Sequence, residues 1–253
     1  MARKLHILVT NDDGYFSEGI NALYKGLSRI AEVRMVAPDR EQSASSHSLT
    51  LNRPLRMHQL DKLRYTTDGT PTDCVMLALH VIYKKRKPDF IISGINHGAN
   101  MGDDVTYSGT VAAAIEGAIL RIPSIAVSMA NHAPGTPMDR AAQFVARLVK
   151  AWPKLNVMPS TFLNVNLPAD NGKPYKEFEF TSQGMRQYKD VIIRKTDPRG
   201  HSYYWIGGRP KWKTTKGTDF ATVNRGLVSI TPMQLEFTDG VMLERLGSLS
   251  VRI

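Results

Sequence analysis

The chain has 253 residues, of which 42% are hydrophobic and 22% charged, and its formal net charge at pH 7 is +10. These proportions exclude a wholly disordered chain, and the length allows a substantial buried core. The single cysteine, Cys74, excludes a disulfide framework, and no apolar run approaches the length of a membrane span. With no leader-like segment before the first predicted strand, we expect one cytoplasmic domain over residues 1–253 without membrane contact.

The positive charge raises the alternative of a nucleic-acid-binding protein. The basic residues are dispersed, however, and the densest cluster, residues 84–87, follows a predicted helix, where cations complement the helix dipole. The sequence has no recognition-helix, zinc-finger or aromatic RNA-binding signature. We therefore favour a positive field that attracts anionic substrates, and we expect no dedicated nucleic-acid site.

Two adjacent aspartates, Asp12 and Asp13, follow the first predicted strand. Residues 6–9 form a short apolar run, which is typical of a buried strand in a parallel sheet. Because neighbouring strand residues face opposite ways, both carboxylates point to one place only where the backbone turns, which Asn11 and Gly14 allow. Two like charges side by side repel unless a cation separates them or one is protonated, so the pair predicts a hard divalent cation. The alternative is a surface turn with two solvated carboxylates.

The next elements follow from their periodicity. An apolar stripe over residues 17–30 predicts a helix, and residues 33–37 predict a second strand. The loop over residues 40–48 then holds four serines and His47 at the carboxyl end of that strand, so it is a source of a hydroxyl ligand. Thr70 as N-cap and Pro71 at the first helical position predict a helix start, and residues 90–92 predict a strand that ends at Gly94.

A second loop, residues 93–104, is rich in glycine and asparagine, which is typical of a backbone shaped around a ligand. It leads to Ser108, Gly109 and Thr110, which open a predicted helix. Free N–H groups and hydroxyls at such a helix start bind anions, and Gly109 allows a close approach to the main chain. Ordinary N-capping by Ser108 is the alternative, but the shared sheet edge with the aspartates favours a phosphate site.

Strands over residues 125–127, 161–167, 178–181 and 223–231, a helix around residues 142–149 and a short final helix within residues 235–249 complete the prediction. This order predicts an α/β fold: a doubly wound, mostly parallel sheet over about residues 1–180, with a β-rich C-terminal extension over about residues 181–253. Exposed aromatic residues are typical of interfaces. The extension offers four aromatic side chains as candidates for a core or for an oligomer contact: Tyr203, Tyr204, Trp205 and Trp212.

Taken together, the strand-end loops offer carboxylates, hydroxyls, amides and a helix start. This all-oxygen set suits Mg²⁺ or Mn²⁺ better than zinc, which prefers histidine or cysteine ligands. A cation at Asp12 and Asp13 beside a phosphate at the helix start predicts metal-assisted hydrolysis of a phosphate ester. The roles of His47 and His97 stay open at this point.

Four segments resemble the SurE family of survival-protein nucleotidases, in order along the chain: residues 9–14 (Val-Thr-Asn-Asp-Asp-Gly), 36–48, 69–74 (Gly-Thr-Pro-Thr-Asp-Cys) and 93–110. A later stretch, residues 217–232, resembles the family as well, whereas residues 235–253 do not match it. The resemblance implies a Rossmann-like core that hydrolyses nucleoside 5′- and 3′-monophosphates with one divalent cation per subunit, Mg²⁺ or Mn²⁺. In some members the activity extends to short polyphosphate.

Position by position, the resemblance places the metal ligands on Asp12, Asp13, Ser43 and Asn96, and the phosphate contacts on Asn100, Ser108, Gly109 and Thr110. We expect Asp12 and Asp13 to be the catalytic residues, one of them as general base. The resemblance also implies a homodimer or homotetramer joined through C-terminal elements.

Two other functions remain as alternatives. A haloacid-dehalogenase-like phosphatase also uses strand-end aspartates, but it needs an Asp-x-Asp pair, and Asp12 and Asp13 are adjacent. A non-catalytic nucleotide-binding module would bind nucleotides without releasing phosphate.

Overall fold

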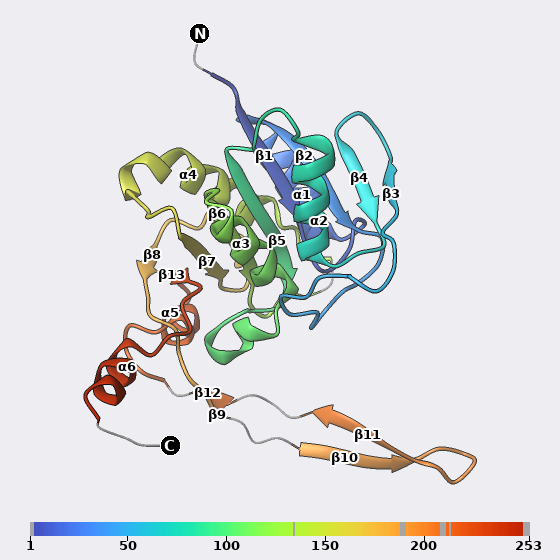
Figure 1. Ribbon diagram of the computed structural model, residues 1–253, viewed down its shortest axis with the longest axis vertical. Helices are drawn as coiled ribbons and strands as arrows, with labels where there is room; N and C mark the ends of the chain where they lie inside the picture. Colours follow the sequence, from blue (N-terminus) through green and yellow to red (C-terminus); the bar gives the residue numbers. More distant parts are fainter. Residues whose placement is uncertain (1–2, 134, 188–190, 208–210, 213, 250–253) are drawn as a thin grey trace.

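The computed structural model describes residues 3–133, 135–187, 191–207, 211–212 and 214–249. Within them, the strands of the central sheet follow the order β3-β4-β2-β1-β5-β6-β7-β13-β8 (Figure 1). Their bounds are β1 (Leu5–Thr10), β2 (Ala31–Pro38), β3 (Met57–Gln59), β4 (Arg64–Thr67), β5 (Phe90–His97), β6 (Ser124–Met129), β7 (Thr161–Leu167), β8 (Phe178–Phe180) and β13 (Val228–Gln234). The strands from β4 to β7 in this order run parallel, while β3 and β13 run antiparallel to β4 and β7. The predicted α/β class with a doubly wound, mostly parallel sheet is confirmed.

The order of the strands reverses beside β1. From β1 the chain moves outward through β2 to β4, and it then returns to the other side of β1 and continues through β5, β6 and β7. In open α/β sheets, ligands bind outside the carboxyl ends of the strands at such a switch point. The topology therefore places the expected site at the carboxyl ends of β1 and β5, where Asp12 follows β1 and Asn96 lies near the end of β5.

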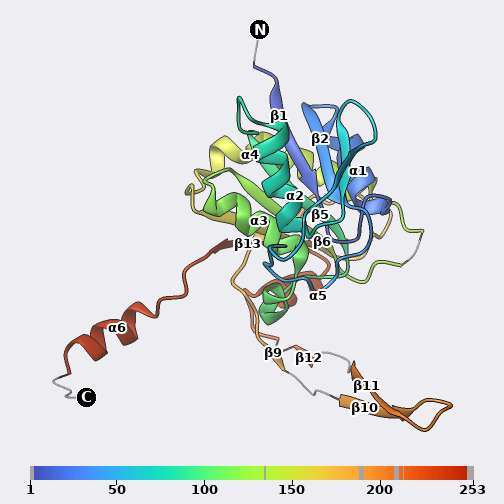
Figure 2. The same cartoon turned by 45° about the vertical axis from the view of Figure 1, so that its right-hand side comes forward.

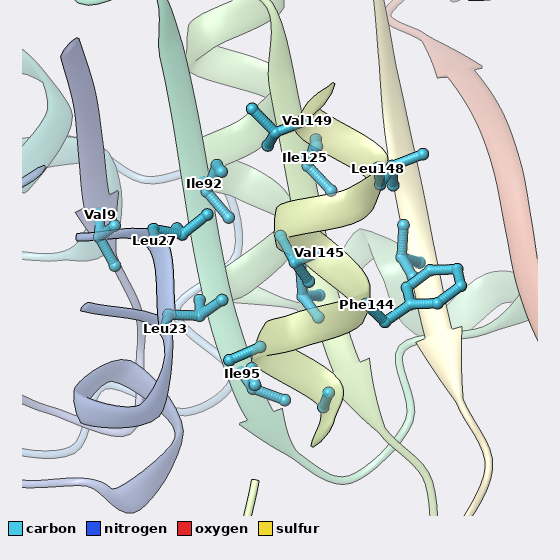
Figure 3. Packing of buried hydrophobic residues seen from close by; sticks show 14 of the residues in the cluster. Val9, Leu23, Leu27, Ile92, Ile95, Ile125, Phe144, Val145, Leu148 and Val149 are labelled. Atoms are coloured by element: carbon cyan, nitrogen blue, oxygen red, sulfur yellow. The ribbon is translucent and has the colours of Figure 1, made fainter. Parts of the chain in front are cut away.

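Helices cover both faces of the sheet. One face carries α1 (Glu18–Leu27) and α4 (Asp139–Leu155); the other carries α2 (Pro71–Leu77), a π-helical turn (Ala78–Ile82) and α3 (Gly109–Ile119). Strand alternation divides the core accordingly, since Ile7 and Val9 pack with α1 and α4 whereas Leu8 packs with α2 and α3. Figure 3 shows side chains of α1 and α4 packed over the sheet, where burial of each such residue stabilises the fold by about 1.5–3 kcal/mol.

The start of α2 has the predicted capping. Thr70 accepts a hydrogen bond from the backbone N–H of Asp73, and the Asp73 carboxylate accepts one from the backbone N–H of Thr70. Pro71 occupies the first turn, and Cys74 is fully buried in the core. Because these contacts lie within four residues of sequence, local residue types were enough to predict them.

Two predicted element boundaries were wrong. Strand β5 does not end at Gly94 but continues to His97, with a register shift against β6 between Ser93 and Asn96. The predicted late strand over residues 223–231 begins only at Val228, because Val223 lies in helix α5 (Asp219–Asn224) and Gly226, with φ +81°, forms the turn between them. The short strands β3 and β4 were not predicted, since their polar sequences carry no clear alternation.

The C-terminal third is built differently from the core. Strand β13 returns to the central sheet, between β7 and β8, whereas β10 (Val191–Thr196) and β11 (Ser202–Gly207) form a separate antiparallel hairpin. The hairpin projects beyond the carboxyl edge of the sheet, and α6 (Gly240–Gly247) lies away from the sheet in both views (Figures 1 and 2). Strands β9 (Arg186–Gln187) and β12 (Lys211–Trp212) connect the hairpin to the core, although the side chain of Trp212 lies outside the described part of the chain.

No helix in the described ranges combines the length and apolar character that crossing a bilayer requires.

Candidate active site

A cavity of about 1100 Å³ opens at the carboxyl edge of the sheet, at the switch point. Its lining includes most of the predicted site residues: Asp12, Asp13, Ser43, Asn96, Asn100 and Ser108. Gly109 and Thr110 are buried directly behind this lining. The structure thus brings the predicted metal ligands and the predicted helix start to one place.

The turn after β1 is held by its own side chains. Asn11 donates its Nδ2 hydrogens to the carbonyl oxygen of Gly14 and to Oγ of Ser17, at 2.9 and 2.8 Å. Gly14 has φ +90°, and a Cβ there would lie 3.1 Å from the backbone of Arg40, so both its conformation and its packing require glycine. These contacts fix the backbone that carries the aspartates.

Asp12 is packed against the start of α3. It is 4% exposed, and its Oδ1 accepts a hydrogen bond from the hydroxyl of Thr110, whose backbone N–H also bonds to it. Burial raises the pKa of Asp12 to about 6; the Thr110 hydroxyl opposes this shift, and the charge of Asp13 adds to it. Thr110 therefore has a use that the sequence did not reveal, because its hydroxyl orients Asp12.

Asp13 faces the carboxyl end of β5. Its Oδ2 accepts a hydrogen bond from the backbone N–H of His97 at 3.2 Å, and the His97 Nδ1 lies 4.0 Å away. Burial raises the pKa of Asp13, while the ring and backbone of His97 act in the opposite direction. Two adjacent carboxylates whose burial disfavours their charges fit a site for a cation.

Ser43 and Asn96 complete an all-oxygen donor set. Asn96 donates Nδ2 to the carbonyl oxygen of Gly98 at 2.9 Å, so Oδ1 is the side-chain atom that could coordinate a cation. Ser43 is exposed on the cavity and donates its hydroxyl to Glu41, another lining residue that the sequence did not single out. Within the described residues, no three His, Cys, Asp or Glu side chains are grouped so that they could hold a metal ion. The donors at this place are carboxylate, hydroxyl and amide oxygens, which suit a hard divalent cation.

Asn100 is held by a buried network from β6 and β7. Its backbone N–H donates to Oδ1 of Asn166, and its carbonyl oxygen accepts from the amides of Asn164 and Asn166, all at 2.8–2.9 Å. Its own amide contacts the hydroxyl of Ser128 at 2.8 Å. Since this hydroxyl both donates and accepts, the amide can present either its oxygen or its NH₂ group to the cavity. These hydrogen bonds therefore hold Asn100, a predicted phosphate contact, in a fixed position.

Three histidines lie around the site. His47 does not line the cavity; its Nε2 lies 2.9 Å from Oε2 of Glu116 in α3, so it ties the loop of Ser43 to that helix. His97 lines the cavity, and its ring stacks on His132 with centroids 4.5 Å apart. Glu116 and His132 were not predicted from the sequence as residues near the site, because the local pattern around each of them gives no sign of it.

The C-terminal extension also reaches the cavity. Arg186 of β9 and Ile206 of β11 are part of the lining. Arg186 pairs with the carboxylate of Asp104, and its backbone N–H donates to Asp103 at 3.0 Å, so β9 is joined to the 3₁₀ turn Gly102–Thr106 before α3. Tyr107, between this turn and Ser108, lines the cavity too and is 58% exposed.

Comparison with known proteins identifies the family that this chain matches. Residues 7–190 match the model of the family described as survival protein SurE. The chain is 50% identical over 236 residues to the 5′-nucleotidase SurE of Pelobacter propionicus, which covers 93% of this chain and 95% of that protein. It is 47% identical over 243 residues to the 5′-nucleotidase SurE of Geobacter metallireducens, with 96% of each chain covered.

A solved structure has the same fold. The crystal structure of a SurE protein from Aquifex aeolicus superimposes with a TM-score of 0.84 over 95% of this chain and 98% of that one, at 41% sequence identity.

Proposed function

The chain belongs to the survival protein SurE family, and from this premise we propose that it is a nucleotidase that releases phosphate from nucleoside 5′- and 3′-monophosphates. The observation that carries the proposal is the juxtaposition of Asp12 and Asp13 with the start of α3 in one cavity. A paired carboxylate site and a helix N-terminus are complementary to a cation and a phosphate, respectively. Activity on short polyphosphate and a cytoplasmic location stay predictions.

We propose that Asp12, Asp13, Ser43 and Asn96 hold one Mg²⁺ or Mn²⁺. The donor chemistry supports this, since all four side chains line the cavity and each offers an oxygen. When bound, such a cation offsets the two carboxylate charges, polarises the phosphoryl oxygens and makes a bound water more acidic.

The chain's own residues bind the phosphate, stabilise the charge that develops on it and accept the proton of the attacking water. Asn100 and Ser108 contact the phosphoryl oxygens, and the N-terminal end of α3, opened by Gly109, stabilises their growing negative charge. One carboxylate of the aspartate pair accepts the proton of the attacking water. As the new P–O bond forms, the P–O bond to the nucleoside breaks, and the nucleoside oxygen takes a proton from solvent. Thr110 keeps Asp12 in place through its hydroxyl during this step.

The test is phosphate release from a panel of 5′- and 3′-nucleoside monophosphates with Mn²⁺, Mg²⁺ or EDTA. We expect release that depends on the metal and falls about a hundredfold or more in Asp13→Asn, because the substitution removes a charge that both the cation and the proton transfer need.

Asp39→Asn is the matched control. Asp39 also follows a strand at this edge, but it pairs with Arg40 and does not line the cavity, so its loss should leave the rate within about twofold of wild type. A folded wild-type protein that binds nucleotides but releases no phosphate would point to the non-catalytic nucleotide-binding module. An acid-stable phosphate adduct on Asp12 would favour the haloacid-dehalogenase-like alternative.

We also propose that the protein is a homodimer or homotetramer joined through its C-terminal extension. Helix α6 has no buried residue, and Val241, Leu243 and Leu246 are each more than half exposed. The β10–β11 hairpin likewise exposes Tyr204 and Trp205. An eight-residue helix is marginal by itself in water, and so many exposed apolar side chains are typical of a surface that another chain covers.

A further inference from the structure

The cavity is much larger than a phosphate group requires. Its volume of about 1100 Å³ is slightly above the range of about 300–1,000 Å³ that is typical of pockets for whole organic ligands. Its lining combines the polar donors described above with apolar surface, most prominently Tyr107 and Ile206, which are 58% and 88% exposed. An apolar lining beside a phosphate site fits the flat, largely apolar face of a nucleobase.

The backbone of Tyr107 is fixed although its side chain is exposed. Its carbonyl oxygen accepts a hydrogen bond from the backbone N–H of Ser46 at 3.1 Å, and its own N–H donates to the carbonyl oxygen of Asp104 at 3.1 Å. The hydroxyl of Ser46 also donates to the carbonyl oxygen of Thr106 at 2.7 Å. An aromatic side chain on a fixed backbone loses little conformational freedom when it stacks on a ligand, so it costs little to bind there.

Tyr107 also lies at the right place along the chain. It directly precedes Ser108, the N-cap of α3 and a proposed phosphate contact. In a nucleotide, one ribose separates the phosphate from the base. A base on the Tyr107 side chain is therefore compatible with a phosphate at the helix start.

We propose that Tyr107 is the stacking platform for the nucleobase, with Ile206 as an apolar neighbour in the same cavity. The inference rests on the proposed nucleotidase function and deepens it. Stacking uses the π face that every base has, so Tyr107 favours nucleotides over phosphate esters without a base and discriminates little between bases.

The experiment compares wild type, Tyr107→Ala and Tyr107→Phe on AMP, UMP and ribose 5-phosphate. We expect Tyr107→Ala to raise KM for both nucleotides roughly tenfold to a hundredfold with kcat nearly unchanged, because a binding contact remote from the reacting bond is lost. KM for ribose 5-phosphate should stay the same. Tyr107→Phe should behave as wild type, because the ring is kept.

Phe16→Ala is the matched aromatic control. Phe16 is 85% exposed near the aspartates, but it packs edge-on against Tyr15 and is not part of the cavity lining. The proposal is overturned if KM for nucleotides is unchanged in Tyr107→Ala, if it rises in Phe16→Ala instead, or if KM for ribose 5-phosphate rises equally, since the last result means that Tyr107 only supports the helix start.

Failure of the proposed nucleotidase function can be distinguished from failure of the stacking role of Tyr107. In that case the wild type releases phosphate from none of the three substrates. The dissociation constants of AMP and ribose 5-phosphate, measured by calorimetry on the same variants, then replace KM. A selective loss of AMP affinity in Tyr107→Ala supports the stacking role, and an equal affinity in all variants overturns it.

Discussion

Gly109 packs directly behind the aspartate pair, in a place with no room for a side chain. A Cβ on Gly109 would lie 2.6 Å from Oγ of Ser45, 2.9 Å from Cβ of Asp12 and 3.0 Å from Cγ of Pro71. The sequence suggested that Gly109 lets a phosphate approach the main chain. The structure shows another reason for the glycine, which is the close packing of α3 on Asp12.

We predict that Gly109→Ala lowers both stability and activity. Relief of the contact with Asp12 requires a shift of α3 or of the aspartate, at a cost of about 1–3 kcal/mol in the free energy of unfolding. Because catalytic geometry tolerates little displacement, kcat should fall by about tenfold or more. Urea unfolding and phosphate release measure the two effects. Gly240→Ala is the control, since nothing beyond its chain neighbours and its own helix backbone lies within 4 Å of its Cβ position. Equal behaviour of the two variants would contradict the prediction.

Among the elements, α4 is joined to the segment after β7 by an ion pair between a buried carboxylate, Asp170, and a guanidinium, Arg140, whose side chain is 32% exposed. Asp170 has a side-chain exposure of 1%, and its two oxygens accept three hydrogen bonds from the guanidinium of Arg140, at 2.6–3.0 Å. Burial would raise the pKa of Asp170, but the hydrogen bonds from Arg140 and from the backbone N–H of Gly172 outweigh it and hold the pKa below its ordinary value. This pair anchors the helix at the edge where β6 and β7 end.

The lowered pKa predicts how this contact depends on pH. A carboxyl whose folded pKa lies below its unfolded value stabilises the fold above the unfolded pKa, about 3.9, and the contribution disappears as the pH falls through the folded pKa. We expect Asp170→Asn to cost about 1.5–3 kcal/mol at pH 7 and progressively less below about pH 4. Denaturant unfolding at several pH values measures the difference.

Asp139→Asn is the comparison for this variant. Asp139 is 54% exposed and lies 3.6 Å from Lys25, so loss of its charge should change the free energy of unfolding by less than about 1 kcal/mol. A cost for Asp170→Asn that did not vary between pH 7 and pH 3 would show that the ion pair is not its cause.

For the molecule as a whole, the exposed apolar surface of the extension is the feature that a single chain leaves unexplained. We predict that the wild type has a molar mass of two or four times the 28.2 kDa of one chain, and that the double substitution Leu243→Glu and Leu246→Glu lowers it. Charged side chains in a buried apolar contact cost more than the contact gains. Light scattering coupled to size exclusion measures the mass.

Leu51→Glu is the control for the oligomer, because Leu51 is 88% exposed in a loop of the core and not in the extension. A wild type of 28.2 kDa would contradict the proposed oligomer. An unchanged mass in the double variant would show that α6 is not the contact.

Local sequence was sufficient where the deciding interactions are local. The turn around Asp12 and Asp13, the capping box at Thr70 and the N-cap at Ser108 each depend on residues at most six positions apart. Strand and helix periodicity then predicted a doubly wound sheet, and the carboxyl-end rule placed the aspartates beside the start of α3.

Tertiary structure decided which distant residues support the site. His47 meets Glu116 from 69 positions away, Thr110 reaches Asp12 across 98, and Asn166 holds Asn100 across 66. The extension likewise enters the cavity through Arg186 and not through a pattern in its own sequence. Periodicity reports which face of an element is buried, but not which side chain of another element lies opposite. Those pairings are fixed only when the sheet order and the packing of the helices bring the elements together.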